Sequence, residues 1–211
     1  MSFYTDRIYP HLVRRLGNPE PIRRVRQRIM PLAEGQVLEI GVGSGANFPY
    51  YDPTRVTTLY ALEPNPGMIR LATRSLRQTS LRVEFLDLPG ERIPLADGTI
   101  DVVVSAFTLC TIASAAVEEA LRGIRRVLRP GGRLIFFELT RADDPAVRHW
   151  QQRWEPLMHW LYAGLYLTRD IPALLSDGGF QIERVDTTYL TRFPKSWAYA
   201  CWGTAIPQAP K

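Results

Sequence analysis

Residues 37–48, with the sequence VLEIGVGSGANF, restrict the possible folds more than any other stretch of the chain. An apolar run that suits a buried strand leads directly into Gly41, Gly43 and Gly45. Glycine adopts backbone angles that other residues avoid, and its missing side chain lets a ligand approach the backbone amides closely. Gly41, Gly43 and Ala46 also fit the pattern G-x-G-x-x-[GA], in which a nucleotide binds after the first strand of a parallel sheet. The segment therefore predicts a strand followed by a nucleotide-binding loop.

Strand-like and helix-like segments alternate along the first two thirds of the chain, which predicts a doubly wound parallel α/β sheet. The unbroken apolar run at 101–112 suits a central strand of such a sheet, because both faces of that strand are covered. The last two predicted strands have no helix between them, so we expect them to pair antiparallel at one edge. Asn65 and Thr168 are the expected N-caps of two helices. Strands are predicted at 35–40, 56–62, 81–87, 101–112, 133–139, 181–190 and 197–206, and helices at 65–78, 114–128 and 168–180.

The length of 211 residues fits one domain. After the fifth predicted strand, the aromatic-rich stretch 143–167 interrupts the alternation and predicts an inserted helical cap. If the N-terminal segment forms a lid over the cofactor, Tyr4 and Tyr9 are its candidate contact residues. We expect a single domain with an N-terminal helical lid at 1–34, a cofactor-binding core at 35–141, the helical cap at 142–180 and the antiparallel strand pair at 181–211.

The composition excludes several classes of protein. Hydrophobic residues make up 45% of the chain and charged residues 22%, which is typical of a globular domain rather than a disordered chain. No run approaches the roughly 18 apolar residues of a transmembrane helix. The N-terminus is charged from Asp6 onward, so we expect a cytoplasmic protein. Cys110 and Cys201 are the only cysteines, which argues against a disulfide framework.

The basic residues suggest possible partners without selecting one. The formal net charge is +5, and arginines are dense between positions 14 and 28. Such a cluster can face nucleic acid, acidic lipid headgroups or an anionic substrate, although a solvated helix face is the simpler interpretation. Nucleic acid is therefore a disfavoured partner, and membrane contact through these arginines is expected to be peripheral at most. The sequence leaves the oligomeric state open.

Two acids near the glycine loop bear on which nucleotide binds there. Glu63 follows the second predicted strand, where a carboxylate can bind the hydroxyls of a ribose. Both dinucleotides and S-adenosylmethionine carry that ribose. Glu39 precedes the first glycine by two positions, where its charge would repel a pyrophosphate and attract a cationic methionine moiety. The chain also lacks a Tyr-x-x-x-Lys pair for hydride chemistry, so S-adenosylmethionine is the favoured ligand.

Four segments resemble, in order and spacing, the successive motifs of class I S-adenosylmethionine-dependent methyltransferases of the type-11, UbiE-like group. They are VLEIGVGSGANF, LYALEPNPGM, IPLADGTIDVVVSAFTLC and VLRPGGRLIFFE. Within that superfamily, SGANFPYY, HWQQRWEPLMHWLYAG and LTRDIPALLSDGGF are similar to the methyltransferase-like 7 thiol methyltransferases and their bacterial relatives. The resemblance implies a Rossmann-like seven-stranded sheet of order 3-2-1-4-5-7-6, with an antiparallel last strand and a helical insert after the fifth strand.

The resemblance also implies which residues hold S-adenosylmethionine and its product S-adenosylhomocysteine. The loop after the first strand would hold the methionine side, and the end of the second strand would hold the ribose. The segment after the third strand, from Leu88 onward, would line the adenine, and the end of the fourth strand would lie near the transferable methyl. The implied cofactor-binding residues are Glu39, Gly41, Gly43, Gly45, Asn47, Glu63, Pro64, Asn65, Met68, Pro89, Gly90, Glu91, Ala106, Phe107 and Thr108.

Methyl transfer requires a nucleophile held against the methyl group in a dry pocket. We expect no metal, because the three histidines show no ligand spacing with cysteines or carboxylates. A base is needed only for a nucleophile that arrives protonated, and the candidate bases are His149, His159, Glu138 and Asp170. The aromatic side chains expected either to close over a hydrophobic acceptor or to form an ordinary packing face are Trp150, Trp154, Trp160, Tyr162 and Tyr166.

The expected reaction is methylation of a small hydrophobic acceptor, and the resemblance favours a thiol or sulfide. A quinone, a phenol and a phospholipid headgroup amine are the alternative acceptors. Two alternatives belong to other classes of function. The protein would bind or methylate RNA through its N-terminal arginines, or it would be a regulator that binds the cofactor without catalysing turnover.

Overall fold

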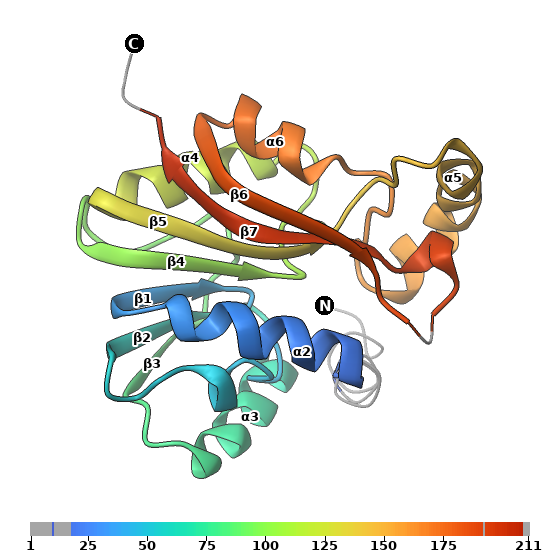
Figure 1. The fold of residues 1–211 in the computed structure, drawn as a ribbon. Coiled ribbons are helices and arrows are strands. Elements are labelled where there is room, and N and C mark those ends of the chain that lie inside the picture. The colour runs from blue at the N-terminus through green and yellow to red at the C-terminus, as the bar shows by residue number, and fades with distance from the viewer. Residues whose placement is uncertain (1–9, 11–17, 192, 209–211) are drawn as a thin grey trace.

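A computed structural model describes residues 10, 18–191 and 193–208 of the chain. The expected lid residues Tyr4 and Tyr9 lie outside these residues. The described residues form a seven-stranded sheet with helices on both faces (Figure 1). The strands are β1 (Gly35–Ile40), β2 (Val56–Leu62), β3 (Val83–Leu86), β4 (Ile100–Ala106), β5 (Leu128–Leu139), β6 (Phe180–Tyr189) and β7 (Tyr199–Pro207). The α-helices are α2 (Glu20–Ile29), α3 (Pro66–Ser75), α4 (Val117–Val127), α5 (Pro145–Leu161) and α6 (Ile171–Asp177).

The sheet has the order β3-β2-β1-β4-β5-β7-β6. The pairs β1–β2, β1–β4, β2–β3 and β4–β5 are parallel, whereas β7 runs antiparallel to both β5 and β6. The predicted doubly wound sheet, its strand order, its antiparallel edge pair and the helical insert after the fifth strand are therefore confirmed.

β4 ends earlier than the apolar run at 101–112 predicts. Its last residue is Ala106, and Phe107 then takes a φ of 59°, a left-handed angle that is uncommon outside glycine. This angle turns the chain out of the sheet, and Leu109 and Cys110 are buried in the loop that follows. The predicted end of the strand is wrong because an apolar run does not distinguish a buried strand from a buried loop.

Each face of the sheet packs against its own helices, as the alternation of side chains in a strand requires. Val102 and Val104 of β4 lie in the cluster that contains the buried residues of α2 and α3. Val103 lies in the other cluster, together with buried residues of α4 and α6. Both faces of β4 are therefore covered, as expected for a central parallel strand.

Capping residues mark where α3 and α6 begin. The side chain of Asn65 accepts hydrogen bonds from the backbone N–H groups of Gly67 (2.8 Å) and Met68 (3.1 Å), so the predicted cap of α3 is confirmed. The predicted cap of α6 is wrong. Asp170, rather than Thr168, accepts from the backbone N–H of Ala173 (3.1 Å).

The inserted helix α5 lies beyond the carboxyl ends of the parallel strands (Figure 1). Its Met158 is buried, whereas Trp150 and Trp160 are 51% and 68% exposed. Within the part of the chain that the structure describes, no helix has both the length and the apolar character required to cross a membrane.

Candidate functional site

A cavity of about 470 Å³ lies at the carboxyl edge of the sheet, where the strand order reverses between β1 and β4. Ligands of doubly wound sheets bind at this switch point. The loops after β1, β2, β3 and β4 line the cavity, as do α2, α5 and the segment before β7. The predicted cofactor residues that line it are Glu39, Gly41, Gly43, Asn47, Glu63, Pro64, Asn65, Met68, Pro89, Gly90, Glu91, Ala106, Phe107 and Thr108.

Gly41, Gly43 and Gly45 of the loop after β1 all have positive φ angles, but the surroundings exclude a side chain at only two of them. A Cβ atom on Gly41 would lie 2.3 Å from the Thr108 hydroxyl oxygen, and one on Gly45 would lie 2.6 Å from the Phe48 ring. A Cβ on Gly43 would meet no protein atom closer than 3.9 Å. Gly41 and Gly45 therefore allow close packing. Gly45 is not among the described residues that line the cavity, whereas Gly43 leaves its backbone open to it.

We expect Gly41→Ala to destabilise the protein more than Gly131→Ala does. Gly131 also has a positive φ, of 79°, but its new Cβ would meet nothing within 4 Å. Both substitutions carry the cost of a left-handed alanine, and only Gly41→Ala adds an overlap with Thr108, a cost of about 1–3 kcal/mol. Urea unfolding of the two variants measures the difference. Equal losses of unfolding free energy would show that Thr108 moves aside freely.

Glu63 lies at the tip of β2 and organises two loops at once. Its side chain accepts hydrogen bonds from the backbone N–H of Gly43 at Oε2 (2.8 Å) and from that of Asn65 at Oε1 (2.9 Å). Glu63 is only 7% exposed, and burial raises the pKa of its carboxyl. A carboxylate oxygen can accept more than one hydrogen bond. The group therefore retains acceptor capacity toward the cavity that it lines.

Glu39 is buried at the end of β1 and accepts two side-chain hydrogen bonds. Asn47 Nδ2 donates to Oε1 (2.7 Å), and the Tyr51 hydroxyl donates to Oε2 (2.7 Å). Burial raises the pKa of Glu39 to about 7, although these hydrogen bonds and the charge of Arg26 oppose the rise. Asn47 Oδ1 is buried and has no hydrogen-bond partner among the described residues. An unpaired buried acceptor is costly, and this one belongs to a residue that lines the cavity.

Glu138 of β5, one of the candidate bases, holds the loop that follows β4. It is completely buried and accepts from the Ser105 hydroxyl (2.6 Å) and from the backbone N–H groups of Thr108, Leu109 and Cys110 (each 3.1 Å). Burial raises the pKa of its carboxyl, against the opposing effect of these donors. The contacts make Glu138 a positioning residue for a loop that lines the cavity.

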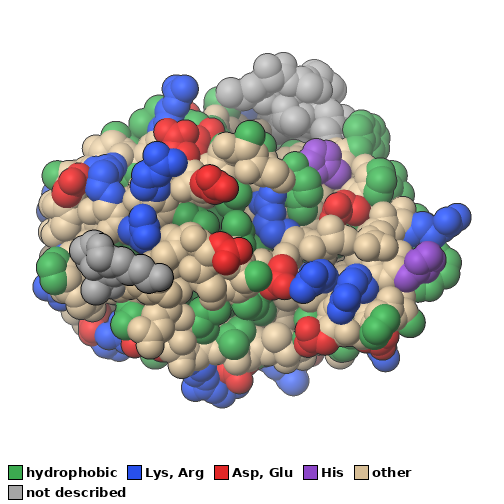
Figure 2. All heavy atoms as spheres, turned by 90° about the horizontal axis from the view of Figure 1, so that it is seen from above, with side chains coloured by type: hydrophobic (Ala, Val, Ile, Leu, Met, Phe, Trp, Pro, Cys, Tyr) green, Lys and Arg blue, Asp and Glu red, His purple; other side chains and the backbone are tan. Residues whose placement is uncertain are grey.

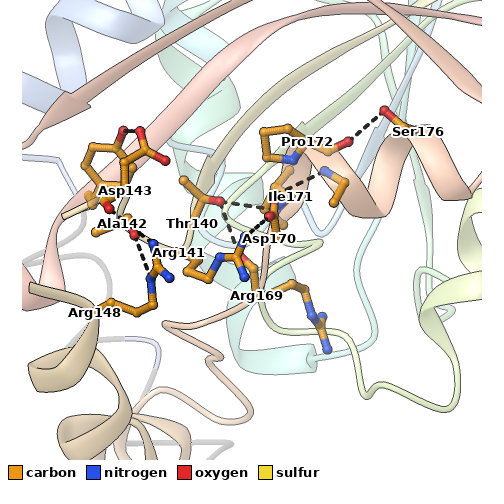
Figure 3. Close-up of polar contacts among 12 residues, drawn as sticks. Thr140, Arg141, Ala142, Asp143, Arg148, Arg169, Asp170, Ile171, Pro172 and Ser176 are labelled. Carbon is orange, nitrogen blue, oxygen red and sulfur yellow. Dashed lines mark hydrogen bonds and ion pairs between the residues drawn. The ribbon is translucent and has the colours of Figure 1, made fainter. Parts of the chain in front are cut away.

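The other candidate bases also lie elsewhere. His149 and His159 are exposed on α5, and the His159 ring packs on Tyr166 with centroids 4.8 Å apart. Asp170 caps α6 and forms an ion pair with Arg141. Next to this pair, the Thr140 hydroxyl donates to the backbone carbonyl of Arg169 and accepts from the backbone N–H of Ile171 (Figure 3). Of the described residues that line the cavity, none is one of the four candidate bases.

The part of the cavity wall formed by α5, the loop after it and the segment before β7 is apolar and only partly matches the expected aromatic set. Of the five aromatic residues predicted from the insert, Tyr162 lines the cavity, and Trp150 and Trp160 face solvent. Trp154 packs on Trp197 with ring centroids 5.4 Å apart. The described lining residues from α5, the loop after it and the segment before β7 are Met158, Tyr162, Ala163, Leu165, Leu190, Phe193, Trp197 and Ala198.

Comparison with known proteins agrees with this geometry. Residues 38–136 match the family described as a methyltransferase domain. The fold is similar to that of the N-methyltransferase NodS from Bradyrhizobium japonicum WM9, solved in complex with S-adenosylhomocysteine, with a TM-score of 0.69. The likeness covers 92% of this chain and 91% of NodS at 16% identity. The chain therefore contains a stretch that matches a methyltransferase domain, within a fold like that of NodS. The matched range runs from β1 to β5, so α2, α5 and the segment before β7 lie outside it.

Two human proteins are similar to the chain in sequence. The thiol S-methyltransferase TMT1B is 40% identical over 162 residues, covering 72% of this chain and 64% of that protein. TMT1A, also a thiol S-methyltransferase, is 38% identical over 145 residues, covering 66% of this chain and 57% of that protein. The chain thus spans less than two thirds of the length of either relative.

The structure adds to this cavity residues that the sequence analysis did not single out. Arg26 lines the cavity from α2, although the sequence suggested a solvated arginine face. One signal was available, since Arg26 shares the buried helix face of Ile22, Val25 and Ile29. Trp197 also lines the cavity. It lies in a short 3-10 turn at Lys195–Trp197, where no periodic pattern marks a side chain that faces the interior.

Proposed function

We propose that this protein is an S-adenosylmethionine-dependent methyltransferase that acts on a small hydrophobic thiol. The observation that carries the proposal is a single cavity lined by two chemically different sets of residues. The polar set contains the loop glycines and the carboxylates at the tips of β1 and β2, and the apolar set contains the residues of α5, the loop after it and the segment before β7. Similarity to proteins named thiol S-methyltransferases supports a thiol as the acceptor.

The polar set of lining residues fits the functional groups of S-adenosylmethionine. Glu63 has acceptor capacity left for ribose hydroxyls. Asn47 Oδ1, which has no hydrogen-bond partner among the described residues, can accept from an ammonium group, and Glu39 nearby favours positive charge. The bare backbone of Gly43 admits a ligand at close range.

The protein's part in the reaction is to orient two molecules and exclude water. Bound S-adenosylmethionine would supply a methyl group on a sulfonium sulfur that is already a good leaving group. Phe107, held at its left-handed φ of 59°, lines the cavity at the end of β4 and packs on Phe137 with ring centroids 4.5 Å apart. Strain of this kind persists where the surroundings enforce it, and it is concentrated at functional sites.

The apolar set of lining residues has little capacity for base catalysis. Among its described members, Tyr162 is the only one with a titratable side chain. An acceptor held against these residues is therefore expected to arrive already ionised, and a thiol ionises more readily than an alcohol or phenol. This is a physical reason, independent of the relatives, to favour a thiol.

We expect the rate with different thiols to follow their acidity. Near neutral pH, thiophenol should be methylated faster than cyclohexanethiol, a thiol of the same size but higher pKa, by about tenfold or more. The rate with each thiol should rise with pH until that thiol is ionised. Mass spectrometry of the methyl thioethers formed from S-adenosylmethionine measures both rates. Equal rates at all pH values would instead require a base in the protein.

The same assay distinguishes the other acceptors. Methylation of a quinone, a phenol or a headgroup amine without methylation of either thiol would retain the methyltransferase and reject the thiol. Binding of S-adenosylhomocysteine with no turnover on the whole acceptor panel would favour a regulator. RNA binding has weaker support, because basic and acidic side chains are interspersed on the face seen in Figure 2. Steeply salt-dependent RNA affinity would revive that alternative.

We expect Glu39 to give S-adenosylmethionine affinity a pH dependence. Because burial raises the pKa of Glu39 to about 7, its carboxyl ionises as pH rises through neutrality. The ionised group attracts the cationic ligand, so affinity measured by calorimetry should rise between about pH 6 and pH 8. Glu39→Gln, which cannot ionise, should bind with nearly the same affinity at both pH values.

Stability of the ligand-free protein should change in the opposite direction. The folded pKa of about 7 exceeds the ordinary value of 4.5, so folding favours the protonated carboxyl. That contribution is fully present below about pH 4.5 and is lost as pH rises through about 7. Thermal melts should therefore show a fall in Tm across this window that is smaller in Glu39→Gln. Parallel curves for the two proteins would place the titration on another group.

A further inference from the structure

Arg169 lies in the loop after α5, residues 162–170, and its side chain crosses to the loop after β4, residues 107–116. Its Nη1 donates to the backbone carbonyl oxygens of Leu109 and Ile112 (the latter at 2.7 Å), and its Nη2 donates to the Ser114 hydroxyl (3.1 Å). Arg169 is half-buried and is not among the described residues that line the cavity. Its contacts therefore join one loop to another.

The loop after β4 is held by two side chains of opposite charge. Glu138 accepts from three backbone N–H groups of this loop, and Arg169 donates to two of its carbonyl groups. Hydrogen bonds with a charged partner are stronger than those between neutral groups. The loop therefore has a charged partner both for its donors and for its acceptors, which fixes its path along the cavity wall.

The two loops also contact each other directly. The backbone N–H of Tyr166 donates to the carbonyl oxygen of Cys110 (2.8 Å), and the Arg169 guanidinium carbon lies 4.2 Å from the centroid of the Tyr166 ring. Gly164 has a φ of 112°, and a Cβ atom there would lie 2.8 Å from the carbonyl oxygen of Thr111. The two backbones therefore approach too closely for a side chain at this position.

Both loops form part of the cavity wall, so their separation sets the width of the cavity between them. The described lining residues are Cys110, Thr111 and Ile112 from the loop after β4, and Tyr162, Ala163 and Leu165 from the loop after α5.

We propose that Arg169 is a positioning residue that fixes the separation of these two loops and thereby sets the size of the methyl acceptor that the cavity admits. This rests on the proposed function. The carbonyl oxygen of Arg169 accepts from the N–H of Arg141 (3.0 Å) and from the Thr140 hydroxyl (3.1 Å), so its side chain extends from a point anchored just after β5 (Figure 3). A closely packed wall discriminates between ligands of different size, whereas a loosened wall can repack around them.

Two aryl thiols of similar acidity but different size test this role. Methylation of thiophenol and of naphthalene-2-thiol is measured by mass spectrometry at saturating S-adenosylmethionine. Arg169→Gln should hold the methyl acceptor less rigidly, so its rate with thiophenol should fall by about tenfold or more. Its rate with the larger thiol should fall less, so the ratio of the naphthalene-2-thiol rate to the thiophenol rate should rise at least about threefold.

The cofactor should bind normally in the same variant. Because the loops after β1 and β2 are unchanged, the affinity of Arg169→Gln for S-adenosylhomocysteine, measured by calorimetry, should stay within about threefold of the wild type.

Arg148→Gln is the matched control. Arg148 lies on α5 and donates from Nε to the carbonyl oxygen of Ala142 (3.2 Å) and from Nη2 to that of Asp143 (3.1 Å), and neither contact reaches the loop after β4 (Figure 3). This variant should have a lower Tm and an unchanged ratio of the two rates. An equal rise of the ratio in both variants would overturn the proposal, as would an unchanged ratio in a folded Arg169→Gln.

Hydrogen exchange measured by NMR gives a readout that needs no turnover. The N–H of Tyr166, which joins the two loops, should exchange at least about tenfold faster in Arg169→Gln and at the wild-type rate in Arg148→Gln. Unchanged protection of this N–H in Arg169→Gln would overturn the proposal. If Arg169→Gln fails to fold, Arg169→Lys, which keeps the charge without the fork, should show smaller changes of the same kind, and their absence counts equally against the proposal.

The proposed function can fail separately. A wild-type protein that neither binds S-adenosylhomocysteine nor methylates either thiol would reject that function, and the exchange of the Tyr166 N–H would still decide whether Arg169 holds the two loops together.

Discussion

Glu63→Ala should lower the affinity for S-adenosylhomocysteine by at least about 100-fold. Two hydrogen bonds from ribose hydroxyls to a carboxylate contribute roughly 1.5–3 kcal/mol each, and about 1.4 kcal/mol corresponds to a factor of ten. The substitution also removes the acceptor that ties Gly43 and Asn65 together, so the loops after β1 and β2 lose their shared anchor. Isothermal calorimetry at constant ionic strength measures the loss directly.

Two further variants show whether the loss comes from the ribose contact. Glu84→Ala on β3 removes an acidic side chain that is 46% exposed and pairs with Arg82, so its affinity should equal that of the wild type. Glu63→Gln keeps one acceptor oxygen and should lose less affinity than Glu63→Ala. If Glu63→Ala binds the ligand normally, the ribose is held elsewhere and the orientation proposed for the ligand is wrong.

The sequence predicted the positions of site residues best where these residues follow directly after strands or depend on local backbone geometry. A parallel α/β sheet places residues that follow successive strands at one edge, so the order of the strands alone predicts that Glu39, Gly43, Glu63 and Phe107 lie together. All four line the cavity. The cap at Asn65 could be predicted for a similar reason, since its partners are the next residues along the chain.

The same reasoning failed where partners are distant in sequence. Glu138 and Asp170 were candidate bases because their side chains are titratable. Only the folded chain shows that Ser105 and the N–H groups after β4 surround one of them, and that Arg141 and α6 hold the other. The presence of an Asp or Glu does not by itself indicate catalysis, because the same two amino acids also serve as buried structural carboxylates.

Glu138→Ala should destabilise the protein by at least about 3 kcal/mol. The substitution leaves the Ser105 hydroxyl and the N–H groups of Thr108, Leu109 and Cys110 without their acceptor. A buried unsatisfied donor costs about 1–3 kcal/mol, and a small cavity adds to the loss. The loop from Phe107 to Thr111 is expected to become mobile, which would disturb the cavity wall at the end of β4. Urea unfolding, with Glu183→Ala on the exposed side of β6 as a control expected to stay within about 0.5 kcal/mol, measures the effect.

Glu138→Gln separates a positioning role from a role as general base. Oε1 accepts from Ser105, Thr108 and Leu109, so a glutamine whose carbonyl takes that place keeps three of the contacts. Its amide group would then face the N–H of Cys110, which now donates to Oε2, and this costs stability without unfolding the protein. If Glu138 is a positioning residue, Glu138→Gln should have a lower Tm and reduced turnover, and its pH–rate profile with an acidic thiol should be unchanged. A general base predicts loss of turnover in a folded protein, because glutamine cannot accept the proton, and that result would return Glu138 to the chemistry of the site.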